Sequence, residues 1–128
     1  MGETDECFAA MCLDNKLGLI AADILDKGTI DAVEIHPRRL VDFALTNKPA
    51  YIVLLHNHPS GDTIISDADI TTTTHIAQIF EPFNIIILDH IVVTGNNFIS
   101  FSQNNVLSSI RGVENAKRKP NKDRIPLN

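Results

Sequence analysis

The sequence contains no apolar run that approaches the roughly 20 residues of a membrane-spanning helix. Its start, residues 1–6, is acidic, whereas a secretory signal begins with basic residues and continues with an apolar stretch. Both absences argue against membrane insertion and against export. We therefore expect a cytoplasmic location and no membrane partner.

Cysteine is scarce, because the chain has only 2, at positions 7 and 12. The two cysteines fall within one predicted strand and would face opposite sides of it, so they cannot easily form a disulfide bond. Neither belongs to a paired motif of the kind that holds structural zinc. These features exclude a disulfide-stabilised secreted scaffold, and we expect both thiols to be reduced.

An excess of positive charge is also missing, because 11 Lys and Arg stand against 16 Asp and Glu, for a net charge of −5. Nonspecific nucleic-acid binding depends on neutralising phosphates, so we do not expect direct nucleic-acid binding by this domain. The one basic cluster lies at residues 117–124. We predict a single domain over residues 1–112 and a basic, flexible C-terminal tail over residues 113–128.

The first half of that domain has the pattern of strands followed by a helix. Residues 6–13 and 17–25 are largely apolar around a turn signal and predict a hairpin. Residues 26–29 would end its second strand, before a short strand at 32–35. A helix would start at Pro37, which suits the first helical position, and run to about Lys48.

The second half alternates strands with one helix. The helix runs from Asp67 to about Glu81, and its buried side is predicted to carry Ile70, Thr73, Ala77 and Phe80. Strands are predicted at 51–55, 84–88 and 98–101, and residues 89–93 either continue the second of these or begin another. Together the segments predict an α/β fold, with a single mixed β-sheet of about six strands and two main helices.

The most informative stretch, residues 54–62, reads Leu-Leu-His-Asn-His-Pro-Ser-Gly-Asp. The apolar run before it predicts a buried strand that ends at His56. Residues two apart in a strand face the same side, so His56 and His58 could direct both imidazoles at one point. A pair of histidines at the end of a strand can also be no more than the start of a polar loop.

Asp69 supplies a third candidate ligand. Two imidazoles and a carboxylate with one open coordination position form the ligand set of a catalytic zinc ion. Ser66 and Asp69 also have a structural explanation, because Ser at a helix N-cap with an acid three residues later resembles a capping box. The two explanations are compatible, but capping alone does not account for the histidines.

The pair His56-x-His58, followed after seven residues by Ser66-x-x-Asp69, resembles the signature of the JAMM, or MPN-domain, metallopeptidases. The resemblance implies Zn²⁺ as the cofactor, with His56, His58 and Asp69 as metal ligands. It also implies a fold similar to that of the cytidine deaminases.

A narrower resemblance is to the bacterial RadC family. It is carried by His-Asn-His-Pro-Ser-Gly-Asp at 56–62, Leu-Asp-His-Ile-Val-Val at 88–93 and Phe-Ile-Ser-Phe at 98–101. The resemblance extends from about Glu6 to about Ser102, which is most of the chain. The literal triplet His-Asn-His does not resemble the HNH nucleases, because in those enzymes the three residues are widely spaced.

The JAMM resemblance implies two catalytic roles. These enzymes place a glutamate at the start of the first strand as the general base, and Glu6 matches that position. Glu34, near a strand end, is the second candidate, ahead of Glu3 and Glu81. The motif serine helps to stabilise the oxyanion, and Ser66 matches it.

Two further histidines receive structural interpretations. His75 lies within the second predicted helix, where a surface or packing position is expected. His90 follows Asp89 in a segment that the RadC resemblance covers, and we expect it to fix local structure by hydrogen bonding rather than to bind metal.

These features predict a zinc-dependent hydrolase of the JAMM type that cleaves a peptide or isopeptide bond in a peptide or protein substrate. One alternative is a noncatalytic metal-binding regulatory module, and another is a DNA repair-associated protein of the RadC family. RadC proteins commonly carry a helix-hairpin-helix region before this domain, so we expect DNA contacts of the family to lie outside the present sequence. The sequence leaves both a monomer and a homo-oligomer open.

Overall fold

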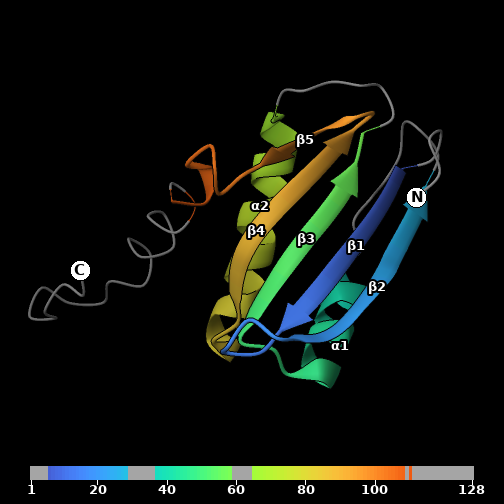
Figure 1. Ribbon diagram of the computed structural model, residues 1–128. Coiled ribbons are helices and arrows are strands. Elements are labelled where there is room, and N and C mark those ends of the chain that lie inside the picture. The colour runs from blue at the N-terminus through green and yellow to red at the C-terminus, as the bar shows by residue number, and fades with distance from the viewer. Residues whose placement is uncertain (1–5, 29–36, 59–64, 109, 111–128) are drawn as a thin grey trace, which may run out of the picture.

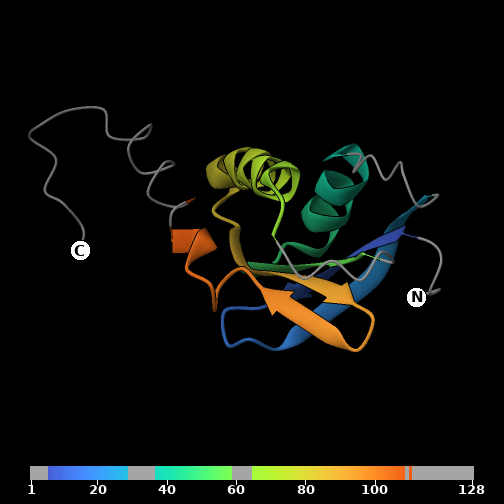
Figure 2. The same cartoon turned by 90° about the horizontal axis from the view of Figure 1, so that it is seen from above.

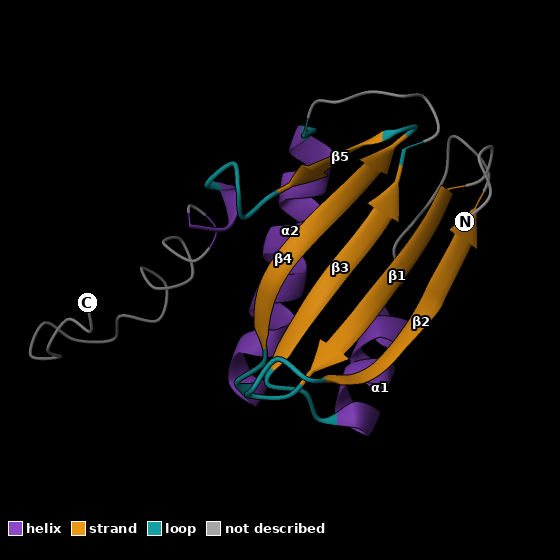
Figure 3. Ribbon diagram, in the orientation of Figure 1, coloured by secondary structure: helices purple, strands orange, loops and turns teal. Residues whose placement is uncertain are grey.

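The computed structural model describes residues 6–28, 37–58, 65–108 and 110 of the chain. They form one mixed sheet of five strands in the order β2-β1-β3-β4-β5 (Figure 1, Figure 3). The strands are β1 (Glu6–Leu13), β2 (Leu19–Gly28), β3 (Tyr51–Asn57), β4 (Ile86–Thr94) and β5 (Asn97–Ser100). β3 and β4 are parallel, and the other neighbouring strands are antiparallel.

Two helices, α1 (Pro37–Asn47) and α2 (Asp67–Phe80), cover the same face of the sheet (Figure 2). A short 3-10 helix, η1 (Glu81–Phe83), follows α2. The predicted α/β fold with a mixed sheet and two main helices is thus confirmed, with five strands in the described part of the chain rather than about six.

The hydrophobic core lies between the sheet and the two helices. Alternate residues of the central strands enter it, as the two-residue period of a strand requires. Its most deeply buried members are Phe8, Ala10 and Cys12 from β1, Ile52 and Leu54 from β3, Val92 from β4, Leu40 and Ala44 from α1, Ile76 and Phe80 from α2, and Phe101, which follows β5. Both cysteines are buried free thiols, as predicted.

The predicted buried side of α2 is also confirmed. Thr73, Ala77 and Phe80 are buried, and Ile70 packs against the core from a partly buried position. Residues 71–74 are all threonine, a poor helix former, so burial of this side stabilises the helix more than local propensity does.

The β3–α2–β4 segment positions the candidate site. α2 connects two parallel neighbouring strands, so the carboxyl ends of β3 and β4 lie at the same edge of the sheet, and the chain enters α2 from that edge (Figure 1). The amide of His58 donates to the carbonyl oxygen of Val93 at 2.7 Å, which continues the pairing one residue past β3. Open α/β sheets generally bind ligands at this edge.

The predicted end of the second strand at residues 26–29 is wrong, because β2 continues to Gly28. Asp26 and Lys27 are typical of a turn, but here they pair with Phe8 and Cys7 of β1. The buried carboxylate of Asp26 lies 3.6 Å from Arg39 Nη1, which also donates to the carbonyl oxygen of Leu25 at 2.9 Å. Tertiary pairing therefore overrides the local turn signal.

One smaller prediction also needs correction, and one open alternative is decided. The strand expected to end at His56 runs to Asn57, because its backbone continues to pair with Val93 of β4. Residues 89–93 continue the preceding strand, so β4 is one element up to Thr94. The strand expected at 32–35 and the tail from 113 lie outside the described residues.

The turn expected between the last two strands is confirmed. β4 and β5 form an antiparallel hairpin in which Thr94 pairs with Asn97. Gly95 has a φ of 59°, a conformation that residues with a side chain rarely adopt. Within the described residues, no helix is both long and apolar enough to cross a bilayer.

Candidate metal centre

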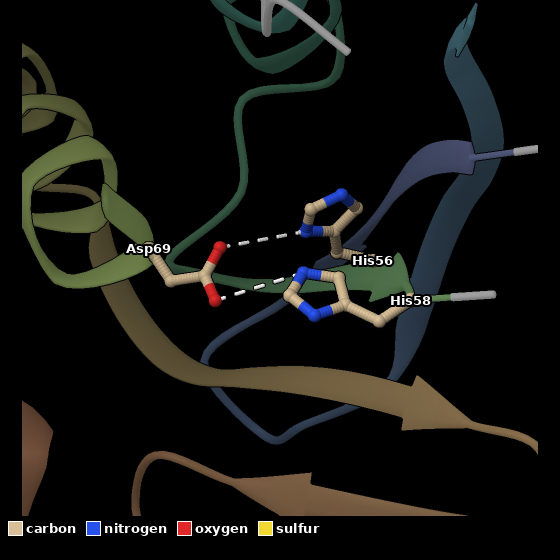
Figure 4. Close-up of side chains that lie close together, drawn as sticks. All are labelled: His56, His58 and Asp69. Carbon is tan, nitrogen blue, oxygen red and sulfur yellow. Dashed lines mark ion pairs between the residues drawn. The ribbon is translucent and has the colours of Figure 1, made fainter. Parts of the chain in front are cut away.

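Three side chains converge at the carboxyl edge of β3: His56, His58 and Asp69 (Figure 4). Asp69 Oδ1 lies 3.8 Å from His56 Nδ1, and Asp69 Oδ2 lies 3.6 Å from His58 Nε2. One candidate ligand atom from each residue lies within 4.8 Å of the other two. The two imidazole rings meet edge to face, with centroids 4.7 Å apart.

Local sequence explains why these side chains meet. His56 is in β3 and His58 follows it by two residues, so both imidazoles point from the sheet toward the start of α2 (Figure 4). Asp69 is held in the first turn of α2 by the predicted capping box, which the structure confirms. Ser66 Oγ accepts a hydrogen bond from the amide of Asp69 at 3.1 Å, and Asp69 Oδ2 accepts from the amide of Ser66 at 3.4 Å.

The spacing of the three side chains fits a small cation. Tetrahedral zinc with ligand bonds of about 2.0–2.2 Å places its ligand atoms about 3.3–3.6 Å from one another. The carboxylate-to-imidazole distances of 3.6 and 3.8 Å are near this range and are too long for good hydrogen bonds. Two nitrogen ligands and one oxygen ligand also suit zinc chemically.

Burial of the cluster also supports a bound cation. Asp69 is only 8% exposed and His56 only 6%, so the carboxylate is largely removed from water. A buried carboxylate is costly unless it is hydrogen-bonded, paired with a positive charge or bound to a metal. The cap bond to the Ser66 amide is long, and a cation between Asp69 and the two rings would supply the missing stabilisation.

Glu6 is the first residue of β1 and lies at the same edge of the sheet as the cluster. It pairs with Gly28 of β2, and Phe8, two residues later, pairs with His56. The backbone therefore places Glu6 next to the end of β3, while its side chain lies outside what the structure describes. The assignment of Glu6 as general base stays a prediction.

The other glutamate candidates are separated from the cluster or lie outside the described residues. Glu81 begins η1, at the opposite end of α2 from Ser66 and Asp69 (Figure 1). A helix of this length spans roughly 20 Å, so Glu81 is too far away to act at the cluster. Glu3 and Glu34 belong to segments that the structure does not describe.

Asn57 has a role that the sequence did not reveal. Its buried side-chain Oδ1 accepts a hydrogen bond from the backbone amide of Cys7. The middle residue of the His-Asn-His triplet thus holds the start of β1, directly after Glu6, against the end of β3. The asparagine between the two histidines was the available signal, but its partner depends on the pairing of β1 with β3.

His90 is fully buried in β4, and its Nδ1 lies 2.6 Å from Thr73 Oγ1 of α2. Its ring stacks on Phe101 with centroids 4.5 Å apart, and it lies 6.4 Å from the His56 ring, outside the cluster. This placement agrees with the structural role expected for His90. His75 is exposed, which agrees with the surface position expected for it.

Burial lowers the pKa of His90 to about 4. The nearby His56 lowers this pKa further, while the carboxylates of Asp69 and Asp89 oppose the shift and His58 adds a smaller lowering effect. His90 is therefore neutral near pH 7, which agrees with its position in the core.

Asp89 organises the turn after β5. Its Oδ1 accepts from the amides of His90 at 2.8 Å and Ser102 at 3.0 Å, and its Oδ2 accepts from the Ser100 hydroxyl at 2.6 Å. The Asp-His pair at 89–90 thus joins two structural networks, one on each side of β4. These contacts give a physical reason for the presence of Asp89 and His90 in the segment 88–93.

Comparison with known proteins adds the family. A family model described as the RadC-like JAB domain matches residues 1–106. The UPF0758 protein YkfG of Escherichia coli (strain K12) is 41% identical over 102 residues, which are 80% of this chain and 65% of YkfG. The UPF0758 protein Smlt0399 of Stenotrophomonas maltophilia (strain K279a) is 40% identical over 107 residues, or 84% of this chain and 46% of that protein.

A further relative is the UPF0758 protein YeeS of Escherichia coli (strain K12), which is 39% identical over 102 residues, covering 80% of this chain and 69% of YeeS. The chain thus spans 65% of YkfG and less than half of Smlt0399. The resemblance seen in the motif at 56–69 is confirmed over most of the sequence: the chain belongs to the RadC family and contains its JAB/MPN-type domain.

Proposed function

We propose that this domain is a zinc-dependent hydrolase of the JAMM type that cleaves a peptide or isopeptide bond. The observation that carries the proposal is the convergence of His56, His58 and Asp69, with one ligand atom of each within 4.8 Å of the others. Membership of a JAB-domain family supports the same reaction class.

The three cluster residues would hold the metal through His56 Nδ1, His58 Nε2 and a carboxylate oxygen of Asp69. A zinc ion bound there would supply Lewis-acid chemistry, lowering the pKa of a coordinated water to about 7 and polarising the substrate carbonyl. His58 is the more exposed of the two histidines, so substrate would approach from its side.

Glu6 is assigned as the general base. Hydrolysis of an amide needs a group that takes a proton from the attacking water and returns it to the leaving amine. The backbone position of Glu6, at the edge where β1 meets the end of β3, supports this assignment. Asn57 would support the role by fixing the amide of Cys7, the residue next to Glu6.

Ser66 is assigned to stabilise the oxyanion. Its Oγ accepts a hydrogen bond from the Asp69 amide, which uses a lone pair and leaves the hydroxyl proton available for donation. A donor directed at the developing negative charge is worth roughly 3–4 kcal/mol in other hydrolases. The capping role and the catalytic role can therefore coexist.

Metal analysis tests the first half of the proposal. The protein is purified without chelator, and its metal content is measured beside His58→Ala and His75→Ala. We expect stoichiometric zinc in the wild type and in His75→Ala, whose histidine is exposed and outside the cluster. Zinc that is absent from the wild type, or unchanged in His58→Ala, would contradict the proposal.

A cleavage assay tests the second half. Zinc-loaded protein is incubated with a proteome-derived peptide library and with isopeptide-linked peptides, and newly formed amines are labelled and identified. We expect products with the wild type, and we expect Glu6→Gln to keep zinc but lose them. Equal product formation by Glu6→Gln would remove Glu6 from the mechanism, and zinc binding without any cleavage would favour a noncatalytic metal-binding module.

A further inference from the structure

A chain of buried polar groups links the sheet to the carboxylate-bearing turn of α2. His90 Nδ1 lies 2.6 Å from Thr73 Oγ1, and Thr73 Oγ1 donates to the backbone carbonyl oxygen of Asp69 at 2.7 Å. His90 and Thr73 both have an exposed fraction of 0%. Such bonds are strong contributors in the interior, because an unpaired buried partner is costly.

The number of available protons determines which group donates in each of these two hydrogen bonds. The Thr73 hydroxyl has one proton, and the Asp69 carbonyl can only accept, so that proton points to Asp69. His90 must then donate from Nδ1–H to Thr73 Oγ1, which leaves the lone pair on Nε2. The arrangement selects one tautomer of the ring and gives each bond a defined donor.

The end of this hydrogen-bonded series that lies in the sheet is held by strand pairing and by ring stacking. His90 lies in β4 and pairs in register with Leu54 of β3, while His56, two residues farther along β3, pairs with Val92. The His90 ring is also stacked on Phe101. The residue that holds Thr73 is therefore fixed relative to the strand that carries His56.

The end of the hydrogen-bonded series that lies in α2 is Asp69, the candidate ligand. Asp69 is joined to the sheet by its own backbone carbonyl, through Thr73 one helical turn later. Ser66 fixes the same residue from the other side through the capping box. Both contacts therefore act on the residue whose carboxylate faces the two imidazoles.

We propose that Thr73 and His90 are positioning residues that set the distance between Asp69 and the His56–His58 pair, and so set the metal affinity of the site without binding the ion. The inference rests on the proposed metal site. The ring of His90 lies 6.4 Å from that of His56, and among the described residues it does not belong to the group of candidate ligands. Residues that orient metal ligands typically change affinity 10–100-fold when they are replaced.

The chain provides a matched control at the next position. Thr74 Oγ1 donates to the carbonyl oxygen of Ile70 at 2.7 Å, the same bond to the preceding turn that Thr73 makes, and within the described part of the chain it has no bond to a histidine. Thr73→Val and Thr74→Val therefore remove the same local bond from the same helix. Only Thr73→Val breaks the link to His90.

The experiment measures zinc affinity by competition with a chromophoric chelator, and the visible absorption spectrum of the cobalt-loaded protein. We expect Thr73→Val to weaken zinc binding about 10–100-fold and to alter the cobalt spectrum. Thr74→Val should match the wild type, and Thr73→Ser, which keeps the hydroxyl, should restore most of the affinity. If Thr73→Val does not fold, His90→Gln is measured in its place.

The outcomes separate the two proposals. Wild-type protein that binds no zinc would overturn the metal site and this inference together. Wild-type zinc binding with an unchanged affinity in Thr73→Val, or an equal loss in Thr74→Val, would overturn the positioning role alone. A loss confined to Thr73→Val that Thr73→Ser reverses supports the inference.

Discussion

Asp69 belongs both to a helix cap and to the candidate metal cluster. Its carboxylate closes the capping box of α2 and also faces His56 Nδ1 and His58 Nε2. A sequence can reveal such a residue because both roles leave local signals: the serine three residues earlier and the histidines two apart. The link between Thr73 and His90 leaves no such signal, since it depends on where β4 lies beside β3.

The two roles of Asp69 can be separated with Asp69→Asn, which keeps an oxygen for the Ser66 amide and removes the charge. We expect zinc affinity, measured by chelator competition, to fall by more than about tenfold. We expect the metal-free protein to lose less than about 1 kcal/mol in urea denaturation, because the cap remains. Asp67→Asn removes an exposed charge from the same helical turn and should leave zinc affinity unchanged.

His90 predicts a pH dependence of stability. Its pKa is lowered to about 4 in the folded protein, against about 6.5 in the unfolded chain, so between these values only the unfolded state takes up the proton. The free energy of unfolding should therefore be highest above about pH 6.5 and fall by up to about 3 kcal/mol toward pH 4 from this residue.

The measurement is urea denaturation of chelator-treated protein across this pH range. His90→Gln should show a shallower decline below pH 6.5 than the wild type, because its side chain does not titrate. His75→Gln, which replaces an exposed histidine, should follow the wild type. The same slope in His90→Gln and the wild type would rule out this origin of the pH dependence.

At the scale of whole elements, the ends of strands were harder to predict than their existence. Residues 26–28 have the composition of a turn, yet β2 continues through them because β1 offers a pairing partner and Arg39 lies beside Asp26. Asn57 belongs to β3 and reaches across to β1. Each correction involves a partner distant in sequence, which residue patterns within one segment do not contain.

Asn57 predicts how the start of β1 responds to substitution. Asn57→Ala leaves the buried Cys7 amide without its acceptor, which costs about 1–3 kcal/mol and should loosen the strand next to Glu6. We expect faster hydrogen exchange at the Cys7 amide and a larger loss of hydrolysis than of zinc affinity. Asn57→Asp keeps the acceptor oxygen and should preserve protection of that amide; slow exchange at Cys7 in Asn57→Ala would contradict this role.

For the whole molecule, the mixed sheet and two helices could be predicted, but the strand order could not. The order β2-β1-β3-β4-β5 puts β1, the first strand in the chain, beside β3, which the sequence reaches only after α1. The alternation of apolar residues predicts strands and says little about which strands pair. This pairing is what brings Glu6 to the edge of the sheet that holds the histidines.

Net charge gives a prediction for the intact domain. At −5 the chain has few positive charges to release counterions from phosphates, so we expect no salt-sensitive binding to DNA. Fluorescence anisotropy with a labelled forked duplex at low ionic strength checks this. Binding that weakens steadily as salt is added would return the DNA-repair alternative to consideration for this domain.

The three cluster side chains come from two elements, the β3 end and the first turn of α2. An ion bound by all three side chains would crosslink the two elements, and its binding free energy would contribute to the folding free energy of this half of the domain. After chelation, the start of α2 should be the first region to open and to admit a protease, well before the rest of the sheet unravels. Metal supply in the cell would then set how long the protein survives as well as whether it works.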